Sequence, residues 1–288
     1  MLFQLILQGI ATGFVYALVA LGYTFVFRCL NQVIYAQGHI FMVGSFMGYA
    51  ASTKLGLDAV STLLLMLLAG VAFGFLLDRV IFRKLYDVAT MTFVIAAIGL
   101  GIILQNAVRI LYPEPVKYPP IFGTRVFRIF NAQIAEPYLW VIAISLLLIA
   151  ALYCFLTFTR YGQAMRAVAS DRTIAAAMGI NVKVYISATI SLSAAIAVIG
   201  GVLIGPLYFA SFDMGGMIGL KAFSAAVLGG ITNISGAAIG GVVLGILENL
   251  SAGYISSAYK DVVSLGVLIL MLLFRPHGIL GKAKPTKV

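Results

Sequence analysis

The sequence predicts an all-α, polytopic membrane protein: a single transmembrane domain, residues 1–288, built as a bundle of about eight or nine spans. Hydrophobic residues make up 62% of the chain and charged residues 10%, and the mean hydropathy is +1.08. Residues 1–27 contain no charge and are long enough to cross a hydrocarbon core of about 30 Å as a helix. The apolar runs are continuous rather than alternating, which excludes a transmembrane β-barrel.

Nine apolar segments follow one another along the chain. One of them, 219–231, is short for a complete crossing, so a re-entrant half-helix covered by protein is the alternative there. The expected spans are 2–27, 33–53, 59–77, 88–110, 137–158, 185–209, 219–231, 236–252 and 262–274.

The distribution of Lys and Arg predicts that the N-terminus lies outside and the C-terminus inside. If all nine segments cross, the inner loops and the tail 275–288 hold 12 basic residues and the outer loops hold six. Basic residues concentrate on the cytoplasmic side of membrane proteins, which also explains the basic pI without nucleic acid. The inner set is Arg28, Arg79, Arg83, Lys84, Arg160, Arg166, Arg172, Lys183, Arg275, Lys282, Lys284 and Lys287.

The largest expected outer loop, 111–136, is rich in proline. Proline lacks a backbone N–H and interrupts helices, so this loop is expected to be extended and rich in turns. Either it contacts a partner on the outer face or it is a simple connector. The prolines are Pro113, Pro115, Pro119 and Pro120.

Motifs for catalysis, nucleotide binding and metal binding are missing from the sequence. There is no Walker A sequence, HExxH, CxxC or Gly-x-Ser-x-Gly, and His39 and His277 are far apart. The sequence therefore predicts no catalytic residue, no metal site and no cofactor bound by this chain. Energy for transport would come from a partner or from an ion gradient.

One acidic residue, Glu248, lies well within an expected span. Ion-coupled carriers hold ionisable groups at membrane depth, so Glu248 is a candidate ion-coupling site. The alternative is that it snorkels or pairs with a base, and an ion pair between Lys221 and Glu248 is geometrically allowed. The shortage of other buried carboxylates disfavours a secondary carrier.

Several polar residues lie inside expected spans and are candidates for a solute path. The alternative is that they hold helices together, at about 1 kcal/mol per contact in lipid. The candidates are Tyr35, Gln37, Gly38, His39, Gln105 and Asn106.

The segment 160–184 is the longest break in the apolar pattern that has helix-forming composition. Asp171 is expected to cap a short helix, 172–178, and Gly179 to end it in the left-handed conformation. Ile174 and Met178 would share one face of that helix. Two short helices with an apolar tip would suit docking to a cytoplasmic partner, and an amphipathic hairpin lying on the anionic inner leaflet is the alternative.

This segment resembles the coupling segment of ABC-importer permeases of the branched-chain amino acid (Liv-type) family. There a Gly-x-Ala-x-Arg-Ala run is followed by an acid, alanines and Gly-Ile. The resemblance extends to blocks at 16–23, 219–230, 236–241, 259–263 and 274–281. The matching coupling residues are Gly162, Ala164, Arg166, Ala167, Asp171, Ala175, Gly179 and Ile180.

One region departs from the family pattern. The family commonly reads Ile-Asn-Phe-Ala-His/Gln-Gly-Asp/Glu after its first span, whereas this chain has Val-Ile-Tyr-Ala-Gln-Gly-His at 33–39. Ile34 replaces the Asn and His39 replaces the acid. If this stretch lines the path or supports its gate, the resemblance does not specify the exact solute.

The resemblance implies one permease subunit of an ABC importer in a bacterial or archaeal inner membrane. Its partners would be a second homologous permease, identical or different, two cytoplasmic ATPases that use ATP and Mg, an external solute-binding protein and membrane lipid. The solute would be leucine, isoleucine, valine or a related apolar amino acid. Urea, short amides and other small organic solutes are the alternative within the family, and an ATP-independent carrier or channel is the alternative outside it.

Overall fold

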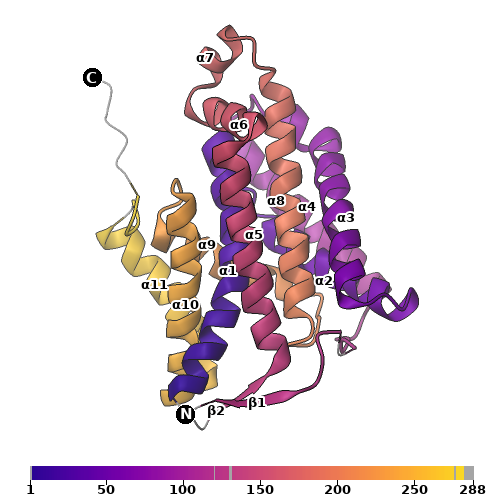
Figure 1. The fold of residues 1–288 in the computed structure, drawn as a ribbon. Coiled ribbons are helices and arrows are strands. Elements are labelled where there is room, and N and C mark those ends of the chain that lie inside the picture. Colours follow the sequence, from indigo (N-terminus) through magenta and orange to yellow (C-terminus); the bar gives the residue numbers. More distant parts are fainter. Residues whose placement is uncertain (1, 120, 130–131, 276, 282–288) are drawn as a thin grey trace.

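The computed structural model describes residues 2–119, 121–129, 132–275 and 277–281, and these fold into an elongated helical bundle (Figure 1). Seven segments of this part are long and apolar enough to cross a membrane. They are α1 (Leu2–Leu30), α3 (Ala59–Val80), α4 (Thr90–Leu111), α5 (Glu136–Phe158), α8 (Val182–Ile204), α10 (Ile234–Tyr254) and Ser257–Phe274, which contains the 3-10 turn η2 (Ser257–Tyr259) and α11 (Lys260–Phe274).

Helices α1 and α8 form the centre of the bundle, and most of their apolar side chains are buried. Helices α3, α4, α5 and α11 surround them and expose most of their apolar surface. A helix that is apolar on all sides and exposed on one of them is expected where the surrounding medium is lipid or another apolar subunit. The peripheral helices therefore have the character of membrane-facing elements.

Glycines allow α1 and α10 to pack with their backbones in contact. A Cβ atom on Gly241 would lie 2.5 Å from the Cα of Ala17, and one on Gly13 would lie 2.7 Å from the Cα of Val242. Helices in lipid associate through such close approaches because there is no hydrophobic drive between them. Packing at small residues thus fixes the position of α10 against the central helix.

Two shorter helices, α2 (Gln37–Lys54) and α9 (Met214–Gly229), complete the bundle. The expected span 33–53 was wrong at its start, because residues 31–36 are not helical. The expected span 219–231 starts too late, since α9 begins five residues earlier, and its 16 residues extend about 24 Å. Gly215 and Gly216 contribute little hydropathy, so the hydropathy pattern did not indicate the first turn of α9.

The two ends of α9 contact different parts of the chain. Before α9, Ala210 pairs with Val116, which follows α4. In the last turn of α9, the backbone oxygen of Leu228 accepts a hydrogen bond from the backbone N–H of Ile279, a residue that follows α11. Helix α9 therefore lies between the segment that follows α4 and the segment that follows α11, and it is shorter than the seven candidate spans.

The loop 111–136 contains a β-hairpin, so the expectation of an all-α fold was incomplete. Strands β1 (Val126–Ile129) and β2 (Ala132–Ala135) pair in antiparallel register, with Val126 opposite Ala135. The β-branched and aromatic residues Val126, Phe127 and Ile129 favour a strand, and the proline-rich residues before them masked this signal. Pro120 lies outside the described residues.

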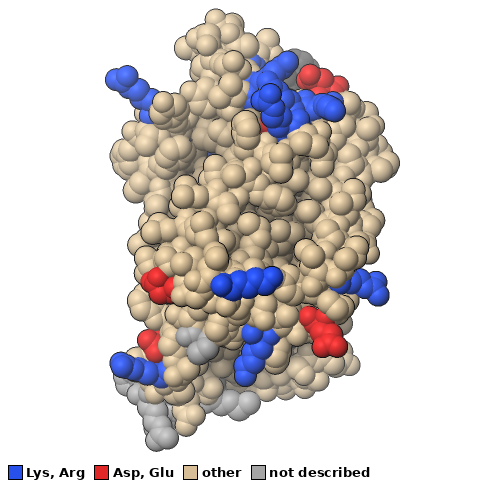
Figure 2. Space-filling model, turned by 90° about the vertical axis from the view of Figure 1, so that its right-hand side faces the viewer, with Lys and Arg blue, Asp and Glu red and all other residues tan. Residues whose placement is uncertain are grey.

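The two ends of the bundle differ in structure. The N-terminus and the hairpin lie at one end, and the short helices α6 (Arg160–Ser170) and α7 (Arg172–Ala177) lie at the other (Figure 1). On the face shown in Figure 2, the densest group of basic side chains also lies at the α6–α7 end. Lys282, Lys284 and Lys287 of the predicted basic tail lie outside the described residues.

Candidate functional site

The paired-helix loop between α5 and α8 is built by three local capping interactions. Thr159 Oγ1 accepts from Gly162 N at 3.0 Å and caps α6. Asp171 Oδ1 accepts from Thr173 N at 2.8 Å and Ile174 N at 3.0 Å, which caps α7. Gly179 follows α7 with φ +82°, in the left-handed region that glycine adopts without strain. The expected cap and C-terminal glycine are confirmed.

The matched coupling residues divide into anchors and exposed groups. A Cβ on Gly162 would lie 2.5 Å from Leu156 Cα, so α6 packs directly on the end of α5. Ala175 is buried and accepts from Ile180 N at 3.1 Å. Ala164, Ala167, Asp171 and Ile180 are half-buried, and Arg166 and Gly179 are exposed.

The end of the predicted loop was placed too late. Helix α8 begins at Val182, capped by Asn181, whose Oδ1 accepts from Val184 N at 3.4 Å. Asn181 is a favourable N-cap, so the sequence contained this signal.

Helix α7 projects beyond the ends of the long helices (Figure 1). Its apolar residue Ile174 is 61% exposed, and Met178, which follows it, is 77% exposed. Arg172 holds the base of α7, because its Nε donates to the backbone oxygen of Cys29 at the end of α1 at 2.8 Å. The loop thus presents an apolar tip on a base that is tied to the central helix.

Gln37, the first residue of α2, is buried where α1, α2 and α8 meet. Its Nε2 donates to Ser193 O at 3.1 Å, and Ser193 Oγ in turn donates to Gly22 O at 3.0 Å. The amide rests on Gly22, where any side chain would collide with it. The structure uses this side chain to join three helices.

Removal of the Gln37 amide is expected to destabilise the bundle. In a Gln37→Leu variant the buried Ser193 carbonyl loses a donor, which costs about 1–2 kcal/mol. Unfolding of the purified protein in graded detergent mixtures measures this change. Asn106→Leu is the control, because the exposed Asn106 donates only to Ile102 O of its own helix. Equal stability of the two variants would contradict the assignment.

Two of the candidate path residues, Tyr35 and Gly38, lie against α9. The Gly38 backbone faces Gly215 and Gly219, and a Cβ on Gly38 would lie 2.5 Å from Gly219 Cα. Tyr35 precedes α2 instead of lying within it, and its ring is 5.9 Å from that of Phe223, which also meets Tyr23 at 5.7 Å. The sequence did not indicate Tyr23 or Phe223, because aromatic residues are common in any span.

The remaining candidates, His39, Gln105 and Asn106, lie at two different places: one is the contact between α2 and α4, and the other is the exposed side of α4. His39 packs over Gly101 of α4, near Gln105 of the same helix. Asn106 is on the exposed side of the same helix and is not part of this contact. Of the six candidates, the structure therefore brings together Tyr35, Gln37, Gly38, His39 and Gln105 around the start of α2, and it leaves Asn106 outside.

A buried ion cluster joins α9, α10 and α11. Lys221 Nζ lies 2.7 Å from Glu248 Oε1 and 2.8 Å from Asp261 Oδ1. Ser264 Oγ donates to Glu248 Oε2 at 3.4 Å. Glu248 is almost fully buried, whereas the side chain of Asp261 is half exposed. The sequence missed Asp261 and Ser264, which are distant along the chain.

Comparison with known proteins agrees with this architecture. The family described as "Branched-chain amino acid transport system / permease component" matches residues 5–272. The LivH branched-chain amino acid permease protein of Salmonella typhimurium is 37% identical over 99% of this chain and 97% of its own. BraD of Pseudomonas aeruginosa is 36% identical over 99% and 97%, and a probable LivH of Methanocaldococcus jannaschii is 29% identical over 96% and 92%.

A solved structure shares the fold. PsaBC from Streptococcus pneumoniae, solved with a Fab, covers 94% of this chain and 91% of its own with a TM-score of 0.52 and 14% identity. A permease component of an ABC importer is not catalytic by itself, since ATP is hydrolysed by separate subunits. With its family profile matched almost end to end and its relatives aligned over their full length, the chain belongs to the branched-chain amino acid transport permease family.

Proposed function

We propose that this chain forms half of the translocation path of an ABC importer for leucine, isoleucine, valine or a related apolar amino acid. The relatives' names specify branched-chain amino acids, and the identity extends along the whole chain. The two cytoplasmic ATPases use ATP and Mg, and an external binding protein delivers the solute. The α6–α7 end faces the cytoplasm, which agrees with the basic residues gathered there (Figure 2).

The exposed tip of α7 is the observation on which this proposal rests. Two large apolar side chains, Ile174 and Met178, point away from a loop that is otherwise well capped and anchored. Exposed apolar groups at the water-facing end of a membrane protein suit a protein interface. Closure of the ATPase pair would move this loop together with α1 and α5, which hold it, as a rigid-body switch between two states.

The second permease would pack on the outward face of α4 and α11. Helix α11 buries only Ser264 within the chain, and the apolar surface of α4 is also largely exposed. The residues around the start of α2 lie between these helices, since α2 contacts α4 and α9, and α9 contacts α11. A homologous subunit on this face would enclose a central path, in a homodimer or a heterodimer.

The test is a double substitution of the tip. Ile174→Asp with Met178→Asp is expected to abolish co-purification of the ATPase and to reduce leucine uptake in reconstituted vesicles to background. Leu55→Asp is the control, because Leu55 is equally exposed but belongs to the loop at the other end of the bundle. The variants must insert at the wild-type level, measured by membrane fractionation.

The outcomes separate the alternatives. If the double variant still co-purifies with the ATPase and shows normal uptake, the loop lies on the inner leaflet and does not link the ATPase to the permease. Competition of labelled leucine uptake by valine, isoleucine, urea and acetamide identifies the solute class. If only urea or acetamide competes, the solute is a small amide and not an apolar amino acid. If the chain without ATPases takes up solute when driven by an ion gradient, the proposal of an ABC importer is wrong.

A further inference from the structure

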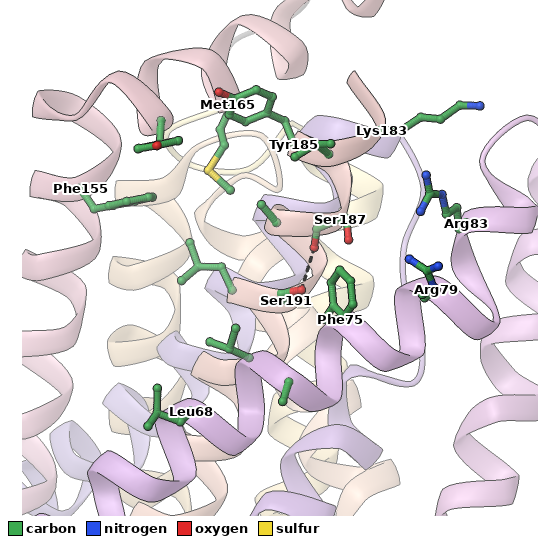
Figure 3. Close-up of a pocket in the computed structure, with 16 residues that line it drawn as sticks. Leu68, Phe75, Arg79, Arg83, Phe155, Met165, Lys183, Tyr185, Ser187 and Ser191 are labelled. Atoms are coloured by element: carbon green, nitrogen blue, oxygen red, sulfur yellow. Dashed lines mark hydrogen bonds between the residues drawn. The ribbon is translucent and has the colours of Figure 1, made fainter. Parts of the chain in front are cut away.

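A cleft of about 850 Å³ opens between α3, α5 and α8, beside α6 (Figure 3). It lies apart from the residues around the start of α2 and from the tip of α7. Its walls are almost entirely apolar, and most of the lining side chains belong to α3 and α8. The apolar lining includes Leu68, Val71, Phe75, Phe155, Met165 and Leu192.

One end of this cleft is basic. Arg79 is the penultimate residue of α3, Arg83 follows it in the turn, and Lys183 is the second residue of α8 (Figure 3). All three are exposed. Throughout the part of the chain that the structure describes, the ion pairs involve Lys221 and neither of these arginines nor Lys183. The neighbouring Asp78 is buried and hydrogen bonds with Tyr86, away from the cleft.

The depth of the cleft matches one leaflet of a bilayer. Leu68 and Arg79 are 11 residues apart on α3, a rise of about 16 Å. A hydrocarbon core is about 30 Å thick, so the cleft extends from the interface to about the mid-plane. Its basic end is therefore at the depth of lipid headgroups and its apolar floor at the depth of acyl chains.

A buried hydroxyl faces the upper part of the cleft. Ser187 lines the wall of the cleft one helical turn from Lys183, and only 9% of its surface is exposed. Its Oγ has no hydrogen-bond partner among the described residues, although its backbone oxygen accepts from Ser191 at 2.9 Å. Buried hydroxyls normally have a partner, so a hydrogen-bond acceptor on a bound molecule would complete this site.

A second cleft provides an internal comparison. It has a volume of about 570 Å³ and lies between α3 and α5 toward their opposite ends. Its walls are similarly apolar, but its lining contains Glu136 and Trp140 and no Lys or Arg. The combination of an apolar groove and a cationic rim is thus specific to the α6–α7 end.

We propose that the cleft at the α6–α7 end binds one anionic phospholipid from the adjacent leaflet. The phosphate lies between Arg79, Arg83 and Lys183, and the acyl chains lie along α3 and α8. The ester carbonyl of the glycerol accepts from Ser187. Basic pockets between transmembrane helices bind anionic headgroups in this way. Because Tyr161 and Met165 of α6 line the same cleft, the lipid also braces the base of the paired-helix loop.

Native mass spectrometry of the full, delipidated chain tests the proposal with phosphatidylglycerol and phosphatidylcholine of identical acyl chains. Wild-type protein is expected to retain one phosphatidylglycerol in preference to phosphatidylcholine. Each cation contributes about fivefold to binding, so Arg79→Gln, Arg83→Gln and Lys183→Gln together should lower retention of phosphatidylglycerol on the order of a hundredfold. The matched control is Lys54→Gln, Lys117→Gln and Arg125→Gln at the other end.

A second variant tests the groove without changing its charge. Ala188→Trp fills the apolar wall next to Ser187 and is expected to lower retention of both lipids at least fivefold, while wild-type thermal stability in detergent shows that the protein is folded. The proposal is overturned if wild type retains the two lipids equally, if the basic triple variant keeps its preference, or if the control triple loses as much as the test triple.

Discussion

A Lys221→Met variant is expected to lose about 3–5 kcal/mol of stability, because it leaves Glu248 as an uncompensated buried charge. Asp261 can turn toward water, but the nearly fully buried Glu248 would keep only weaker hydrogen-bond partners such as Ser264. The free energy of unfolding in graded detergent mixtures measures the effect. The cluster joins α11 to the bundle, so α11 should detach first.

A second substitution separates charge pairing from ion coupling. Lys221→Met combined with Glu248→Gln removes both charges and should recover most of the lost stability. Lys260→Met is the control, since this half-buried lysine lies 5.9 Å from the Tyr208 ring and should change stability by less than about 1 kcal/mol. If Glu248→Gln alone abolishes uptake at unchanged stability, Glu248 serves ion coupling and the structural assignment is wrong.

A Gly38→Ala variant is expected to reduce solute uptake about tenfold or more while the protein still inserts. The new Cβ would lie 2.5 Å from Gly219 Cα and close to the Gly215 carbonyl, both of them backbone atoms that cannot rotate away. Helices α2 and α9 must then separate, at a cost of about 1–3 kcal/mol. If about 1.4 kcal/mol of this strain raises the barrier of the transport cycle, the uptake rate falls tenfold.

Gly216→Ala is the matched control for this prediction. Gly216 lies on α9 beside Gly215, but a Cβ there would meet no atom within 4 Å. Its replacement should leave uptake unchanged and favour the helix slightly. Uptake by vesicles that contain each variant with its partners measures both effects. Wild-type uptake by Gly38→Ala would show that close contact of α2 with α9 is not needed for transport.

The paired-helix loop was predictable in detail because its structure is local. Asp171 caps the helix that immediately follows it, and Gly179 ends the same helix a few residues later. Such interactions depend on neighbours along the chain, so residue types and spacing are sufficient to infer them. The hairpin at 126–135 was missed because two short strands produce a weaker pattern than a long apolar helix.

The roles of the polar residues within the bundle were not predictable in the same way. The sequence left open whether Gln37 lines a path or holds helices together, and only the packing shows its contact with Ser193, 156 residues away. The pairing of Lys221 with Glu248 was foreseen as an option, whereas the contribution of Asp261 was not. Nothing in the local sequence specifies which helices become neighbours.

Composition and capping residues were enough to predict a helical membrane protein with a capped pair of short helices, and the resemblance of several sequence blocks indicated the family. Each of these signals depends on local chemistry or on runs of residues. Tertiary packing alone decided that α2 and α9 meet at glycines, that one buried lysine pairs with two carboxylates, and that a basic rim borders an apolar cleft. These features depend on contacts between distant segments, and many pairings of similar apolar helices are compatible with the same hydropathy pattern.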